Sequence, residues 1–72
     1  MTNALEHFPE RLAICMKKKG YNYASLAKEI GIDKSRIYNW SKGHNLPQAY
    51  YIVKLCEVLE VSADYLLMGI ER

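Results

Sequence analysis

Residues 34–42, KSRIYNWSK, combine side chains that could recognise a ligand with two side chains that favour burial. On a helical wheel with about 100° per residue, Ile37 and Trp40 fall together on one side. The opposite arc carries cations, hydroxyls and one amide, and no carboxylate: Lys34, Ser35, Tyr38, Asn39 and Lys42, with Arg36 at its edge. A helix held at two apolar points and offering such donors suits the major groove of DNA. The alternative for this helix, taken alone, is an ordinary solvated face.

The residues before this helix predict a second short helix and a tight turn. Leu26, Ala27 and Ile30 give residues 23–30 one apolar face, and Asn22 is a suitable N-cap. Gly31 can take the left-handed conformation that ends a helix, and Asp33 can cap the next one. Residues 23–42 therefore read as two helices joined by a turn.

This stretch resembles the lambda-repressor/Cro-type helix-turn-helix family. Ala27, Gly31 and Ile37 have that family's spacing, A-x3-G-x5-I, and similar residues continue from Arg11 to Gly69. The resemblance implies an all-α fold of five helices, a lambda-repressor-like DNA-binding domain. We expect one domain over residues 1–72, with the helix-turn-helix at about 23–42 and residues 1–7 as a loose arm.

The resemblance also implies which residues read the bases of double-stranded DNA and which contact its backbone. Helix 34–42 would enter the major groove, and the residues facing base edges would be Lys34, Ser35, Tyr38 and Asn39. The residues expected along the DNA backbone are Tyr23, Arg36, Lys42, Gly43 and His44.

Two departures from the family affect this assignment. The family commonly has glutamine at position 23, where it touches the DNA backbone and steadies the reading helix, whereas Tyr23 can still donate a hydroxyl. The family often joins the ends of its first and third helices by an arginine–glutamate pair, but here those positions hold Met16 and Ser41. Because both charged side chains of the pair are absent, neither is left buried without its counterion. We expect apolar contact around Met16 and Trp40 to replace the pair.

Charge is distributed unevenly along the 72 residues, whose formal net charge is +2. Residues 11–42 contain eight Lys and Arg against Glu29 and Asp33, a net charge of +6, whereas residues 1–10 and 43–72 each carry −2. Such asymmetry favours a polyanionic partner that one face of the protein meets.

Several function classes find no support in the sequence. Cys15 and Cys56 lie on apolar stripes without CxxC spacing, so they are expected to be buried thiols, and with His7 and His44 they make no zinc site. No nucleophile with its base and no phosphate-binding glycine loop suggests an enzyme or a cofactor. No apolar run reaches the roughly 18 residues that span a bilayer, and no signal peptide opens the chain, so we expect a cytoplasmic protein.

The remaining helices are expected at about residues 9–19, 48–59 and 62–68. Phe8, Cys15 and Met16 should face the core from the first, and Ala49 and Cys56 from the fourth. Glu60 stands where the family usually has glycine, so a left-handed residue there would cost about 1 kcal/mol. The rest of the expected core is Leu12, Leu26, Ala27, Ile30, Ile37, Trp40, Ile52, Leu55, Leu59 and Leu66.

Two functions compete at this stage. The first is a sequence-specific DNA-binding transcriptional regulator, a phage or bacterial repressor that binds a two-fold symmetric operator as a homodimer. The second is a protein-interaction module of the same fold, an antitoxin-like or anti-repressor partner with weak or no DNA binding. Its contact surface would include Ile14, Val53 and Tyr50-Tyr51. The carboxylate-free outer arc of residues 34–42 favours DNA.

Overall fold

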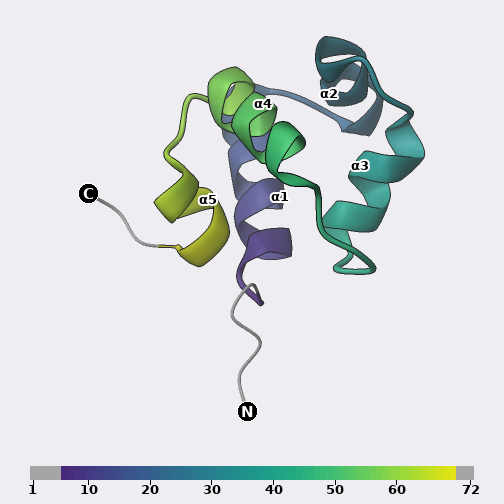
Figure 1. The fold of residues 1–72 in the computed structure, drawn as a ribbon. Coiled ribbons are helices and arrows are strands. Elements are labelled where there is room, and N and C mark those ends of the chain that lie inside the picture. Colours follow the sequence, from purple (N-terminus) through teal and green to yellow (C-terminus); the bar gives the residue numbers. More distant parts are fainter. Residues whose placement is uncertain (1–5, 70–72) are drawn as a thin grey trace.

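The computed structural model describes residues 6–69, and within that range the chain forms five α-helices and no strand (Figure 1). The helices are α1 (Phe8–Lys19), α2 (Tyr23–Ile30), α3 (Lys34–Ser41), α4 (Ala49–Leu59) and α5 (Ala63–Met68). The prediction of an all-α, five-helix fold is confirmed. Helix α3 ends one residue earlier than expected, with Lys42 as its C-cap. Most of the expected loose arm, residues 1–5, lies outside the described residues.

A side-chain cap fixes the start of α2, and a left-handed glycine fixes its end. The Asn22 side chain accepts a hydrogen bond from the Ser25 backbone N–H at 2.7 Å, and Ser25 Oγ accepts one from the Asn22 N–H at 2.9 Å. This reciprocal pair is a capping box. Gly31 ends the helix at φ 91°, and its N–H bonds the Ala27 carbonyl at 2.7 Å. The predicted cap and stop are both confirmed.

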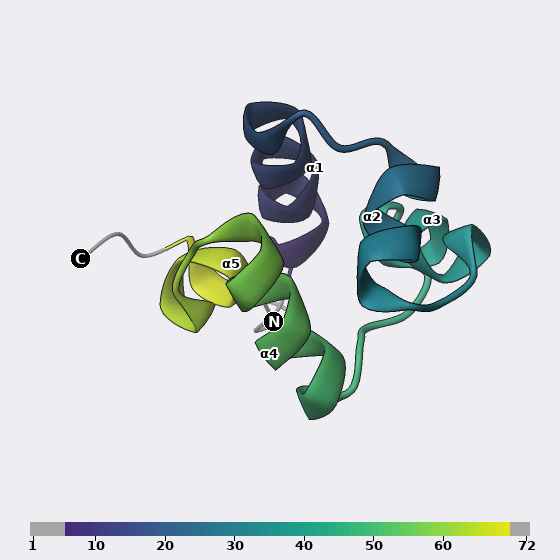
Figure 2. The same ribbon diagram turned by 90° about the horizontal axis from the view of Figure 1, so that it is seen from above.

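Helix α1 packs against α3 and α5, and α4 packs against α2 and α5, so the helices surround one common interior (Figure 1, Figure 2). All five helices contribute to one hydrophobic core, whose buried residues are Phe8, Leu12, Cys15, Met16, Leu26, Ala27, Ile37, Trp40, Leu55, Leu59 and Leu66. Met16 and the 2% exposed Trp40 belong to this one core, in agreement with the apolar contact expected in place of an ion pair.

Four positions differ from the predicted core, one of them the partly buried Cys56. Ile30 and Ile52 are only partly buried and pack against the edge of the core. Ala49 is exposed, because the first turn of α4 projects past the core and the first fully buried residue of that helix is Leu55. The helical period was therefore right, but the core does not extend to the start of α4.

The two cysteines are free thiols, Cys15 within the core and Cys56 only partly buried. Burial raises the pKa of both thiols, so they stay protonated and act as small apolar side chains. Within residues 6–69, no His, Cys, Asp and Glu side chains gather in a group of three that could hold a metal ion. None of the helices in the same range has the length and hydrophobicity that crossing a bilayer requires.

Candidate nucleic-acid interface

The buried side of α3 fixes which of its residues face outward. Ile37 and Trp40 are 0% and 2% exposed, and they hold the helix against the core. Lys34, Ser35 and Tyr38 consequently project on the far side, all exposed to solvent.

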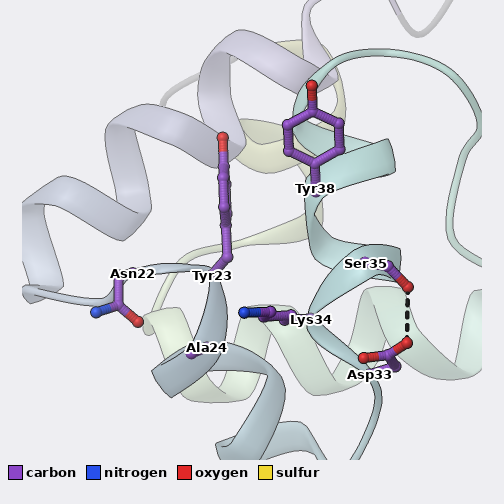
Figure 3. Close-up of a pocket in the computed structure, with 7 residues that line it drawn as sticks. All are labelled: Asn22, Tyr23, Ala24, Asp33, Lys34, Ser35 and Tyr38. Atoms are coloured by element: carbon purple, nitrogen blue, oxygen red, sulfur yellow. Dashed lines mark hydrogen bonds between the residues drawn. The ribbon is translucent and has the colours of Figure 1, made fainter.

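A hollow of about 630 Å³ lies between the start of α2 and the start of α3. It is lined by Asn22, Tyr23 and Ala24 on one side and by Asp33, Lys34, Ser35 and Tyr38 on the other (Figure 3). In Figure 3 the Lys34 side chain extends from α3 toward the start of α2. Three of the four predicted base-reading residues and one predicted backbone residue thus meet at one site.

Tyr38 is enclosed by aromatic and cationic neighbours. Its ring stands edge-to-face with that of Tyr23, with 5.6 Å between centroids and 89° between planes. The His44 ring lies on it at 6.3 Å and 75°, and Lys42 Nζ is 5.7 Å from the Tyr38 centroid. Edge-to-face pairs and a cation over a ring are both favourable. The predicted residues from two helices and a loop therefore form one cluster around Tyr38.

Ser41 connects the end of α3 to the start of α2. Its Oγ lies 3.1 Å from the Tyr23 hydroxyl oxygen and 2.8 Å from the Tyr38 carbonyl oxygen. The sequence did not predict the Tyr23 contact, because 18 residues separate the partners and only the crossing of the two helices joins them.

A carboxylate that the sequence analysis assigned only to capping borders the hollow. Asp33 occupies the N-cap position of α3 but makes no side-chain cap hydrogen bond. Its Oδ2 instead accepts a hydrogen bond from Ser35 Oγ at 2.8 Å, visible in Figure 3. The outward arc of residues 34–42 lacks a carboxylate, yet a negative charge lies at its edge and holds the Ser35 hydroxyl.

Asn39 and Arg36 lie beside a different hollow. This one has a volume of about 220 Å³ and is lined by Arg36, Asn39, Trp40, Asn45, Leu46 and Gln48. Asn39 Oδ1 is 3.4 Å from His44 Nδ1. Asn39 thus stands apart from the other three residues predicted to read bases.

Arg36 is supported by α4 rather than left free in solvent. Its guanidinium carbon lies 4.8 Å from the Tyr51 ring centroid and 5.9 Å from that of Trp40, and its Nη1 donates to the Tyr51 hydroxyl at 3.4 Å. Tyr51 is a contributor that the sequence analysis missed, since no spacing rule joins residues 36 and 51.

The fold and this site define a helix-turn-helix DNA-binding domain. The sequence profile of the helix-turn-helix family matches residues 12–66. The chain belongs to this family, in its lambda-repressor/Cro-type branch, which comprises DNA-binding transcription regulators rather than enzymes.

Individual relatives agree with this membership. The SPbeta prophage-derived uncharacterized HTH-type transcriptional regulator YonR of Bacillus subtilis (strain 168) is 36% identical over 62 residues, which are 86% of this chain and 57% of YonR. The uncharacterized HTH-type transcriptional regulator YazB of the same strain is 36% identical over 61 residues, 85% of this chain and 88% of YazB. The chain spans only 57% of YonR and 53% of a third such regulator, YqaE, which is 31% identical over 62 residues.

Solved structures with this fold include two of one phage repressor. The P22 c2 repressor in complex with synthetic operator 9T matches with a TM-score of 0.83 and 30% identity, over 88% of this chain and 96% of that one. The DNA-binding domain of the P22 c2 repressor in solution matches with a TM-score of 0.82 and 29% identity, over 94% and 88%.

Proposed function

We propose that this chain acts as a sequence-specific, double-stranded DNA-binding transcriptional regulator, a repressor of phage or prophage type. The observation that carries the proposal is the outward face of α3, with Lys34, Ser35 and Tyr38 around a hollow and opposite the buried Ile37 and Trp40. The P22 c2 repressor, which has this fold, has been solved bound to an operator, and YonR is named as a prophage-derived regulator.

In the proposed complex α3 lies in the major groove. Lys34 donates to guanine O6 and N7, while Ser35 and Tyr38 offer hydroxyls to neighbouring base edges. Asn39 is the fourth reader, and it can use both its donor and its acceptor only if its contact with His44 opens.

Other residues of the site would bind phosphates and position the protein without reading sequence. Lys42, Gly43 and His44 follow α3, and Lys42 and His44 lie against the Tyr38 ring. Arg36 offers a guanidinium held against Tyr51. Tyr23, the remaining predicted backbone residue, would have to exchange its contact with Ser41 to bind a phosphate.

Homodimerisation on a two-fold symmetric operator is the second part of the proposal. One α3 covers only a few base pairs, so specificity requires a second copy about one helical turn, roughly 34 Å, along the same side of the duplex. Exposed apolar residues at the start of α4 offer a surface for pairing: Leu46, Tyr50 and Val53. Ile70, a further apolar candidate for this surface from the sequence, lies outside the described residues.

The same exposed residues could instead serve the rival function, that of a protein-interaction module. Tyr50 is 63% and Val53 57% exposed, whereas Ile14 and Tyr51, the other residues of the rival contact surface, are partly buried. A protein-interaction module would use Tyr50 and Val53 for a partner and would leave Lys34 and Tyr38 without a role.

Selection of bound duplexes from a random oligonucleotide pool, followed by mobility-shift titration, tests the proposal. We expect recovered sites to contain an inverted repeat with a guanine and an adenine in each half. Recovered sites without any inverted repeat would contradict the symmetric operator. No enrichment at all, at low and moderate salt, would favour the interaction module.

A further inference from the structure

The groups around Ser41 determine whether the Tyr23 hydroxyl donates or accepts a hydrogen bond. Ser41 has one hydroxyl hydrogen, and the Tyr38 carbonyl oxygen at 2.8 Å can only accept. The Ser41 hydrogen therefore goes to this carbonyl, which is the shorter contact. The Tyr23 hydroxyl, 3.1 Å away, can then bond Ser41 Oγ only by donating its own hydrogen. In this arrangement the Tyr23 hydroxyl hydrogen is engaged by Ser41, and a phosphate oxygen, which needs a donor, would have to take it from that bond.

This hydrogen bond joins α2 to α3, two helices that no ion pair joins within residues 6–69. Tyr23 is the first residue of α2 and Ser41 the last residue of α3, so the bond links the two helices of the helix-turn-helix at the ends far from their turn. Met16, the other position of the missing arginine–glutamate pair, is buried in the core. The bond thus provides a polar connection at the end of α3 where the ion pair is absent.

The same bond also positions Tyr38. The Tyr23 ring stands edge-to-face against the Tyr38 ring, with 5.6 Å between centroids (Figure 3). Ser41 Oγ donates to the Tyr38 backbone carbonyl at 2.8 Å. Tyr38 is 44% exposed, and within residues 6–69 its own hydroxyl makes no hydrogen bond. The backbone and ring of Tyr38 are therefore held in place, and its hydroxyl remains available for a contact with DNA.

We propose that Tyr23 is a positioning residue that aims Tyr38 at the DNA bases through its hydrogen bond to Ser41, and is not a phosphate contact. The inference rests on the proposed DNA-binding function and concerns how its specificity arises. Its consequence is that removing the hydroxyl of residue 23 or of residue 41 weakens the preferred site and spares binding to unrelated DNA.

Variants that remove single oxygens test this inference with little risk to the fold. Tyr23→Phe keeps the ring, Ser41→Ala removes its partner, and Ser41→Thr returns a hydroxyl. Tyr65→Phe, on α5 and remote from the site, is the matched control for a lost tyrosine hydroxyl. Binding is measured by fluorescence anisotropy on a wild-type-selected duplex and on a scrambled duplex of equal length.

We expect Tyr23→Phe and Ser41→Ala each to weaken binding to the selected duplex by about threefold to tenfold, the worth of one hydrogen bond. On the scrambled duplex both should stay within about twofold of wild type, because phosphate contacts carry no sequence information. The double variant should be no weaker than the weaker single variant, since both remove one bond. Ser41→Thr should regain most of the lost affinity, and Tyr65→Phe should not change binding.

Other results would overturn the inference. A phosphate contact by Tyr23 predicts equal loss on both duplexes for Tyr23→Phe, and no loss for Ser41→Ala on either duplex. Failure of Ser41→Thr to recover affinity would equally exclude the bond as the cause. Thermal unfolding of each variant, expected within about 8 °C of wild type, establishes that all are folded during the titration. If wild type itself prefers no sequence, the proposed function fails before these variants are compared.

Discussion

Several side chains of the recognition face are already engaged with one another in the free protein. Ser35 donates to Asp33 at 2.8 Å, and Asn39 contacts His44 at 3.4 Å, so in the proposed complex DNA would compete for both groups. The Tyr38 hydroxyl faces no such competition within the described residues. Groups that keep their internal partner contribute less to discrimination, because an exchanged hydrogen bond adds little net free energy.

Replacing Asp33 by asparagine should strengthen DNA binding. The carboxylate borders the hollow between α2 and α3, where it would repel the phosphates on either side of the groove. Asparagine keeps an acceptor for Ser35 and removes the charge. We expect affinity to rise about twofold to fivefold for any duplex at low salt, and the gain to shrink as salt screens the repulsion.

Glu57→Gln is the control for this change, because it removes the same charge from the exposed side of α4. Equal gains in the two variants would mean that net charge alone acts and that Asp33 has no local effect. A small loss of stability is expected for Asp33→Asn, about 0.3–1 kcal/mol, since a negative charge favours a helix N-terminus.

Asn39→Ala distinguishes base reading from a phosphate contact. If the Asn39 amide reads adenine N6 and N7, its removal should weaken binding to the preferred site by about 1–3 kcal/mol and relax the sequence preference at one position. A phosphate contact predicts equal loss on every sequence. Site selection repeated with the variant measures this directly, and an unchanged selected site would exclude Asn39 as a reader.

At the scale of helices, α3 depends on its neighbours for its structure. It has eight residues and no side-chain cap hydrogen bond, and helices this short are marginal in water. Buried Ile37 and Trp40 hold it to the core, Tyr23 contacts its end, and Tyr51 of α4 supports Arg36. The recognition helix is therefore formed by tertiary packing rather than by its own sequence.

The end of α4 contains backbone strain that can be measured. Glu60 has φ 58° and ψ 48°, and its carboxylate lies 3.0 Å from Lys19 Nζ. Glu60→Gly and Glu60→Ala both remove this exposed ion pair, so the pair cancels in their comparison. Glycine tolerates the left-handed conformation, and we expect its variant to be the more stable by about 1 kcal/mol in urea unfolding. A more stable alanine variant would contradict the strain.

Local chemistry explains which elements could be predicted from sequence. Asn22, Gly31 and Ser62 act on the backbone within a few residues, so the helix ends were predicted to within about one residue. The left-handed Glu60 followed from the glycine that the family has there. The contacts Tyr23–Ser41 and Arg36–Tyr51 span 18 and 15 residues. They depend on helix crossing and on rotamers, which residue spacing does not encode.

At the scale of the whole molecule, positive charge is concentrated in the part of the chain that contains the helix-turn-helix. Residues 11–42, which carry a net charge of +6, form most of α1 and all of α2 and α3, whereas residues 43–72 carry −2. The recognition face therefore belongs to the basic part of the chain. Such a distribution accelerates and orients encounter with a polyanion before any base is read.

Binding should consequently weaken steeply with salt. If each protomer neutralises about four phosphates, the slope of log affinity against log salt for a dimer is near −7, at about −0.9 per phosphate. Lys42→Ala should make this slope shallower by about two units, one for each protomer, and leave the selected sequence unchanged. Lys54→Ala, on α4 outside the basic segment, removes the same charge and should leave the slope as it was. A flat salt response in wild type would exclude phosphate neutralisation as the basis of affinity.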